Sequence, residues 1–207
     1  LGANAVLGVS LAVARAASLD KNSNLFYYLN KNDEYILPTP LMNIINGGAH
    51  ANNALDFQEI MIMPVGAETF SEALRWGSEI FQELKKILSD NGYSTSVGDE
   101  GGFSPEIKHV YDALSLVSKA IKNAGRNLED EVKLAIDAAS SEFFKNGNYI
   151  IDSGDRKLDT SEMIKYWETL VNDYPIISIE DPLDENDYKG YGQLTDLLGK
   201  RIQIVGD

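Results

Sequence analysis

The sequence predicts an α/β protein in which strands alternate with helices along most of the chain. Five short apolar segments have the length and composition of strands, at residues 41–46, 58–64, 132–137, 176–180 and 202–207. The segments between them carry apolar residues at helical spacing and end at turn signals rich in glycine and asparagine. This alternation is typical of a parallel sheet covered by helices, either a barrel or an open doubly wound sheet.

The beginning of the chain has a different pattern from the rest. Residues 2–18 are apolar nearly all round and rich in small side chains, so we expect a helix that is packed closely on both sides. The sequence "LPTP" at residues 37–40 indicates a stiff, extended entry into a new region. We therefore expect two domains, over residues 1–37 and 38–207.

Four helices are expected in the second domain, the last of them short and ending near Gly199. The other three are predicted from apolar residues at helical spacing: Phe70, Leu74, Phe81, Leu84 and Leu88; Val110, Leu114, Val117 and Ile121; and Ile164, Trp167 and Val171. A turn is expected at "KNGN". A closed barrel of this type needs eight strands in roughly 250 residues, and the sequence lacks an initial methionine and stops directly after a strand. We therefore expect a fragment of a longer protein.

Composition and charge exclude several classes of function. The 207 residues are 43% hydrophobic, enough for one sizeable core, and no apolar segment approaches the roughly 18 residues of a membrane span. The formal net charge of −14 should repel nucleic acid and anionic lipid. The absence of cysteine excludes disulfides, thiolate metal sites and a cysteine nucleophile. These absences favour a cytoplasmic protein without a nucleic-acid partner.

Carboxylates follow three of the predicted strands. Asp137 ends "VKLAID", Glu180 ends "IISIE" and Asp207 ends "IQIVGD". Active sites of parallel α/β folds are built at the carboxyl ends of the strands. Three carboxylates that converge there repel each other unless a hard divalent cation binds them, and Mg²⁺ suits such a set of oxygen ligands. The alternative is that each acid caps or begins a helix.

Two glycine-rich loops place titratable residues where backbone can approach a ligand closely. They are "NGGAH" at residues 46–50 and "GDEGGF" at residues 98–103. An acid in such a loop can act as a proton donor if burial or neighbouring charge raises its pKa, although ordinary turns explain most glycine loops. Glu59 interrupts an otherwise apolar strand, and an outward-facing position on that strand would also explain it.

Five motifs together resemble one family. They are "NIINGGAHANNALDFQEIMIMPVGA", "SVGDEGGFSPEI", "IDAASSEFFKNGNY", "YPIISIEDPLDENDY" and "IQIVGD", and in this order and spacing they closely resemble the enolases across essentially all 207 residues. The resemblance implies a partial enolase-type (β/α)8 barrel over residues 38–207. It implies that residues 1–37 end a small N-terminal α+β capping domain.

Enolases are hydro-lyases (phosphopyruvate hydratases) of glycolysis and gluconeogenesis, which interconvert 2-phosphoglycerate and phosphoenolpyruvate plus water with two Mg²⁺ ions. By motif position, the resemblance implies that Asp137, Glu180 and Asp207 bind the metal that grips the substrate carboxylate. It implies that Glu100 is the general acid for departure of the C3 hydroxyl, with Glu59 beside it. The substrate-binding residues that it implies are His50, Gln58, Glu59, Glu180 and Asp207.

The family's general base is a lysine on a later strand, and a serine loop that binds the second metal precedes Leu1. We assign no lysine of this sequence to the base and expect the isolated chain to be inactive. The resemblance also implies a homodimer or higher homo-oligomer. One alternative is a non-catalytic surface adhesion or scaffold protein derived from enolase, with display at the cell surface. Another is a different member of the wider superfamily, against which "GDEGGF" and "NGGAH" discriminate.

Overall fold

The computed structural model describes residues 2–30 and 34–207. The chain divides into two compact units, Leu1–Pro38 and Thr39–Asp207. Each unit has its own internal contacts and is described separately below. Within the described ranges, no helix combines the length and the apolar character needed to cross a membrane.

The first unit contains two helices that contact each other, α1 (Ala3–Asp20) and α2 (Leu25–Leu29). The predicted helix at residues 2–18 is therefore confirmed. The prediction that this helix packs closely on both sides is wrong for this structure, because Val6, Val9 and Val13 are all more than half exposed. The five residues of α2 are too few to cover an 18-residue helix. Within the first unit, the apolar surface of α1 is therefore left largely uncovered.

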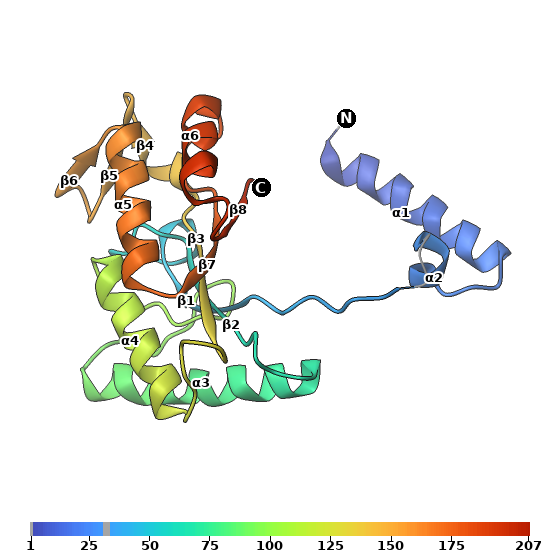
Figure 1. The fold of residues 1–207 in the computed structure, drawn as a ribbon, viewed down its shortest axis with the longest axis horizontal. Helices are drawn as coiled ribbons and strands as arrows, with labels where there is room; N and C mark the ends of the chain where they lie inside the picture. The colour runs from blue at the N-terminus through green and yellow to red at the C-terminus, as the bar shows by residue number, and fades with distance from the viewer. Residues whose placement is uncertain (1, 31–33) are drawn as a thin grey trace. The chain divides into compact units, whose positions relative to one another are not determined.

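The second unit is built on a five-stranded sheet in the order β1-β2-β3-β7-β8 (Figure 1). All five predicted strands are present, as β1 (Met42–Asn46), β2 (Glu59–Met63), β3 (Lys133–Asp137), β7 (Ile176–Glu180) and β8 (Gln203–Val205). The α/β class is confirmed.

The direction of one strand differs from the prediction of a parallel sheet. Strand β2 runs antiparallel to both β1 and β3, whereas β3, β7 and β8 are parallel. The physical reason is the connection between β1 and β2, which contains one short 3-10 turn, Gly48–His50, and no crossover helix. Glu59 therefore begins β2 at the same edge of the sheet where the neighbouring strands end.

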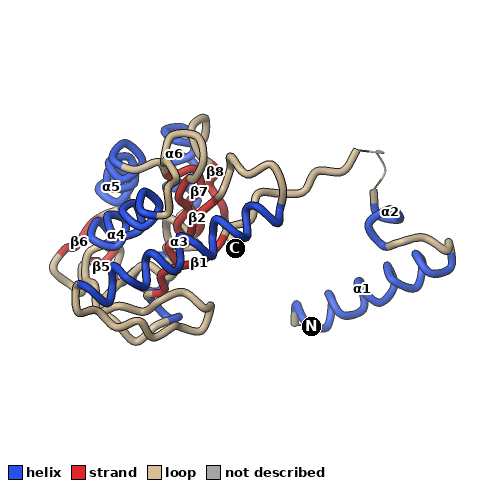
Figure 2. Tube along the Cα trace, turned by 90° about the horizontal axis from the view of Figure 1, so that it is seen from below, coloured by secondary structure: helices blue, strands red, loops and turns tan. Residues whose placement is uncertain are grey.

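Four helices pack beside these strands (Figure 2). They are α3 (Phe70–Asp90), α4 (Val110–Asn123), α5 (Thr160–Asp173) and α6 (Tyr188–Leu198), and α3 packs on α4 as α5 packs on α6. The predicted apolar faces of α4 and α5 are buried. In α3 the buried stripe is centred on Trp76, Ile80 and Leu84, so Phe70 and Leu74 lie at its margin and are exposed, contrary to the prediction.

A second, three-stranded sheet was not predicted. It consists of β4 (Phe144–Lys145), β5 (Asn148–Ile151) and β6 (Arg156–Leu158), all antiparallel. The turn expected at "KNGN" joins β4 to β5, and Asn146 and Gly147 both have positive φ, 51° and 78°. Two positive φ angles suit the right-handed twist of a tight hairpin.

The core lies between the large sheet and its helices, and one of its side chains also supports the edge where the strands end. Trp167 of α5 is fully buried, and its indole nitrogen Nε1 donates a hydrogen bond to the carbonyl oxygen of Pro182 at 2.8 Å. This bond satisfies a buried donor and fixes the backbone directly after β7. The segment beyond Glu180 is therefore held by the core.

Candidate active site

Four polar residues lie side by side in one row across the sheet. Asn46 of β1 pairs with Glu59 of β2, Glu59 with Asp137 of β3, and Asp137 with Glu180 of β7. Side chains at paired positions of adjacent strands point to the same face, and neighbouring strands are roughly 4.8 Å apart. Three carboxylates and one amide thus share a face at the end of the sheet.

Asp137 is the most buried of the three acids in this row, with 7% of its surface exposed. Its Oδ2 accepts a hydrogen bond from Nε2 of Gln58 at 2.8 Å, and its Oδ1 accepts one from the backbone N–H of Ala139 at 3.0 Å. Burial raises the pKa of Asp137 above its usual value, and the two hydrogen bonds oppose this rise. Gln58 thereby orients one carboxylate of the row. Its contact with the substrate stays a prediction.

The backbone turns sharply behind both Asp137 and Glu180. Ala139 and Asp181 have φ of 47° and 44°, in the left-handed region that costs a residue with a Cβ roughly 1–2 kcal/mol. The two turns are joined by hydrogen bonds from Ala138 N to Glu180 O at 3.0 Å and from Ser140 N to Asp181 O at 3.1 Å. This strained pair of turns fixes the strand ends that carry the two acids.

Glu180 is partly buried, and burial raises its pKa, with further contributions from the negative charges of Asp137, Asp181 and Asp207. Asp207 lies two residues beyond Val205, the partner of Glu180 in β8. Its backbone N–H donates to Oδ1 of Asp181 at 3.0 Å. Asp207 is therefore near enough to act electrostatically on Glu180, although its own side chain is exposed.

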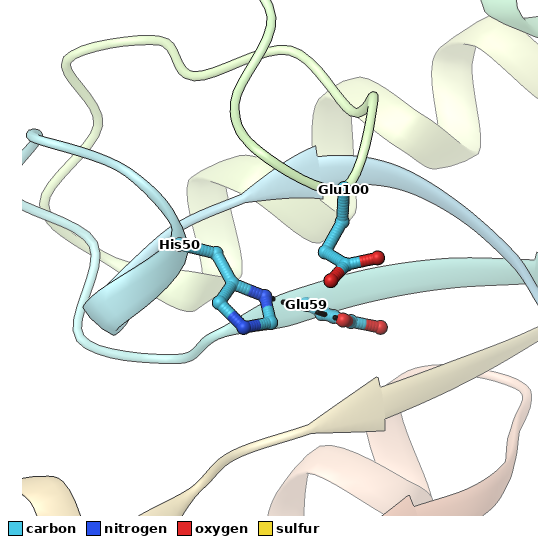
Figure 3. Close-up of side chains that lie close together, drawn as sticks. All are labelled: His50, Glu59 and Glu100. Carbon is cyan, nitrogen blue, oxygen red and sulfur yellow. Dashed lines mark ion pairs between the residues drawn. The ribbon is translucent and has the colours of Figure 1, made fainter.

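A second group of side chains meets the row at Glu59. His50, Glu59 and Glu100 each place one ligand atom within 4.8 Å of the others. Nδ1 of His50 lies 3.3 Å from Oε1 of Glu59. Figure 3 shows that Glu59 comes from strand β2, whereas His50 and Glu100 come from two separate loops. Sequence segments about 50 residues apart thus converge on one strand end.

Close packing requires a glycine at three positions of the two loops, Gly47, Gly98 and Gly102. A Cβ on Gly47 would lie 2.4 Å from the carbonyl oxygen of Phe57, and one on Gly102 would lie 2.4 Å from Oδ1 of Asn46. A Cβ on Gly98 would lie 2.7 Å from the carbonyl oxygen of His50. These distances leave no room for a side chain, so the glycines let the Glu100 loop lie directly against the His50 loop.

The site carries negative charge that no lysine or arginine of the described residues balances. Within residues 2–30 and 34–207, no lysine or arginine forms an ion pair with any carboxylate of the row or with Glu100. Burial raises the pKa of Glu59, and Asp137 and Glu100 raise it further, while His50 lowers it. Oxygen ligands with unbalanced charge are the donor set that Mg²⁺ prefers, so the residues present fit that ion.

Of the three predicted metal ligands, two are neighbours in the sheet and the third lies at the exposed end of the chain. Asp137 and Glu180 are register partners, whereas Asp207 comes from the exposed end of the chain. Among the described residues, these three acids do not form a group whose ligand atoms all lie within 4.8 Å, a distance that His50, Glu59 and Glu100 do meet. That Asp137, Glu180 and Asp207 bind one cation therefore stays a prediction.

Comparison with models of protein families gives one match, to the C-terminal TIM barrel domain of enolase, over residues 34–207. The chain belongs to the enolase C-terminal barrel family. The five-stranded sheet is accordingly part of a TIM-type barrel. Active sites of TIM barrels lie at the carboxyl ends of the strands, which is the edge that carries the row of acids. Membership of the enolase family supports binding of a small-molecule substrate at this edge.

Two residues of this region were not predicted from the sequence. Asn46 is fully buried in the row, and its side-chain atoms find no hydrogen-bond partner among the described residues. Asn53 lies in the His50 loop and bonds to two other segments. Both asparagines stand in the motif "NGGAHANN", where the glycines were the only local signal. A polar residue in an irregular loop has no periodicity that would indicate its partners.

Proposed function

We propose that this chain is part of an enolase that interconverts 2-phospho-D-glycerate and phosphoenolpyruvate plus water. The observation that carries the proposal is the position of Glu59. It belongs both to the row with Asp137 and Glu180 and to the group with His50 and Glu100. A face that can hold a cation thus adjoins a group that can hold and transfer a proton, and dehydration of a carboxylate substrate needs both.

Asp137, Glu180 and Asp207 are the residues that would hold Mg²⁺. The bound ion would neutralise the substrate carboxylate and the charge that develops when the C2 proton is removed. In this arrangement Gln58 keeps the Asp137 carboxylate in one orientation through its 2.8 Å hydrogen bond. Asp181 holds the backbone of Asp207 beside the row.

Glu100 and Glu59 supply the acid side of the reaction. When the C3–O bond breaks, its electron pair leaves with the hydroxyl oxygen, and a proton from Glu100 completes the water molecule. The C2–H electron pair then forms the C2–C3 double bond. Glu59 keeps its proton to higher pH than an exposed glutamate because burial raises its pKa. His50, whose Nδ1 lies 3.3 Å from Oε1 of Glu59, would contact the substrate from the segment between β1 and β2.

The base that takes the C2 proton would be a lysine on a later barrel strand, as the family pattern implies. We therefore expect the 207-residue chain alone to be inactive, and we call the protein that continues it through the remaining strands the full-length enzyme. On this proposal that enzyme is a cytoplasmic homodimer or higher homo-oligomer of glycolysis and gluconeogenesis.

The test is conversion of 2-phosphoglycerate to phosphoenolpyruvate by the purified full-length enzyme, with Mg²⁺ and with a chelator. We expect turnover with Mg²⁺ and its loss with the chelator. Other carboxylates that carry a proton next to the carboxyl group serve as the comparison. Turnover of one of these, with none of 2-phosphoglycerate, would assign the chain to another reaction of the superfamily.

A further inference from the structure

His50 and Glu100 owe their proximity to contacts between two irregular segments. His50 belongs to the segment between β1 and β2, and Glu100 to the segment between α3 and α4. Only Glu59 of this group stands on a strand. The geometry of the proton-donating group therefore depends on whatever holds these two segments together.

One side chain joins both segments to the end of β1. Nδ2 of Asn53 donates a hydrogen bond to the carbonyl oxygen of Asn46 at 2.9 Å and another to the carbonyl oxygen of Pro105 at 3.0 Å. Its Oδ1 accepts a hydrogen bond from the backbone N–H of Leu55 at 3.3 Å. Both amide hydrogens and the amide oxygen are used, which settles the orientation of the amide.

Close to Glu100, the other links of its segment are made by the backbone or the core. Asn46 N donates to Phe103 O at 2.8 Å, Phe103 N donates to Ile44 O at 3.0 Å, and Asp99 N donates to His50 O at 3.3 Å. The Phe103 ring stacks on Phe81 of α3, with the ring centroids 4.1 Å apart. These links hold residues 99–103 of the segment, and Asn53 adds a link further along it, at Pro105.

We propose that Asn53 is a positioning residue that holds Glu100 in register with His50 and Glu59. The inference rests on the proposed function, and it assigns to Asn53 no contact with the substrate. An error of about 1 Å in the position of a reacting group can cost roughly 10² in rate. Substitution of Asn53 should therefore slow the dehydration step, which uses Glu100, more than removal of the C2 proton, which uses the base.

The test uses Asn53→Asp in the full-length enzyme. Aspartate keeps the size of the side chain but presents an oxygen to two carbonyl oxygens, so both donated bonds are lost. We expect dehydration to fall by roughly 10² while exchange of the C2 proton with deuterated water stays near the wild-type rate. Asn52→Asp is the matched control, since it makes the same charge change at the exposed neighbouring position.

A second variant and a second measurement guard against a folding defect or a charge effect. Asn53→Ala removes the bonds without adding charge and should give the same split between the two reactions. Hydrogen exchange of the backbone amides in residues 98–104 should be faster in both Asn53 variants and unchanged in Asn52→Asp.

Parallel loss of dehydration and C2 exchange in a folded Asn53 variant would overturn the inference, as would normal dehydration in either variant. Failure of the wild type to convert 2-phosphoglycerate counts against the proposed function instead. Amide exchange still reports on the Asn53 contacts in that case, and unchanged protection of residues 98–104 would show that Asn53 does not hold the segment.

Discussion

The second unit, Thr39–Asp207, contains two histidine–carboxylate pairs with similar geometry and different surroundings. Nδ1 of His50 lies 3.3 Å from Oε1 of Glu59, and Nδ1 of His109 lies 3.0 Å from Oδ1 of Asp152. By distance alone, the two pairs could not be told apart. The groups around them decide which pair belongs to a candidate site.

The His109 pair is surrounded by balancing charge. Arg156 lies 3.8 Å from Asp152, and Lys108 pairs with Asp155. His109 precedes the first residue of α4, so these contacts tie the start of that helix to the hairpin of β5 and β6. This network is a structural clamp.

The His50 pair has carboxylates as neighbours and no basic partner among the described residues. Glu100 lies within 4.8 Å, and Asp137 raises the pKa of Glu59. Such crowding is unfavourable without a ligand, and it persists where function needs it. The comparison teaches that unbalanced charge at a strand end, more than a histidine–carboxylate contact, marks the candidate site.

The largest expected effect comes from removing the proton donor. Glu100→Gln in the full-length enzyme keeps the shape of the side chain and should lower dehydration by at least roughly 10² to 10⁴, the range for one acid–base group. Exchange of the C2 proton with deuterated water should persist because the base is intact. Asp152→Asn is the control from the other pair and should leave both rates unchanged. Loss of both reactions in a folded Glu100→Gln protein would indicate substrate positioning, and near-normal dehydration would remove Glu100 from the mechanism.

A smaller effect is expected on stabilisation by the metal. A ligand at 100 times its dissociation constant stabilises the folded state by about 2.7 kcal/mol. Asp137→Asn should abolish most of the Mg²⁺-dependent rise in the free energy of unfolding, measured by urea denaturation. Asp152→Asn should retain that rise. Equal stabilisation of both variants would place the cation away from the row of acids.

A third prediction concerns the metal-free protein and pH. The pKa values of Asp137, Glu59 and Glu180 are all raised, mainly by burial, so the folded state binds these protons more tightly than the unfolded state. Their contribution to stability is full below the ordinary values of 3.8 and 4.5 and is lost as pH rises through the raised values.

In a chelator, unfolding free energy should therefore fall as pH rises from these values toward neutrality. Asp137→Asn should reduce that fall by on the order of 1 kcal/mol, a usual size for one substitution. The Gln58 amide can rotate to form a hydrogen bond with the new asparagine. Loss of this hydrogen bond therefore does not account for a difference between the wild type and Asp137→Asn. The same pH slope in the wild type and in Asp137→Asn would show that Asp137 does not titrate as proposed.

The positions of the five strands of the large sheet could be predicted from the sequence, because each is a short, mainly apolar segment with a clear end. The same pattern predicted that Asp137 and Glu180 lie close to each other, since both end parallel strands. The direction of β2 could not be predicted, because residues 47–58 have no periodicity that distinguishes a return loop from a crossover. That reversal is what brings Glu59 to the site.

Other features depend on contacts with distant parts of the chain, which a local sequence pattern does not indicate. Burial of α1 requires a surface to pack against, and its apolar residues are exposed in this structure. Strands β4 and β6 have two and three residues, too few to show alternation. One hydrogen bond of Asn53 links it to Pro105, 52 positions away, and no motif in the sequence indicates this contact.

The smallest expected effect belongs to the His109 pair itself. Asp152 has φ of 57°, and asparagine adopts this left-handed conformation readily, so Asp152→Asn removes the charge with little backbone cost. His109 is about half exposed, which screens its interaction with Asp152. A double-mutant cycle of Asp152→Asn with His109→Ala should give a coupling free energy of roughly 0.2–1 kcal/mol that weakens at high salt. Neither substitution should alter turnover of 2-phosphoglycerate. A large change in turnover would mean that the clamp around His109 takes part in the site, and charge balance would then no longer separate the two pairs.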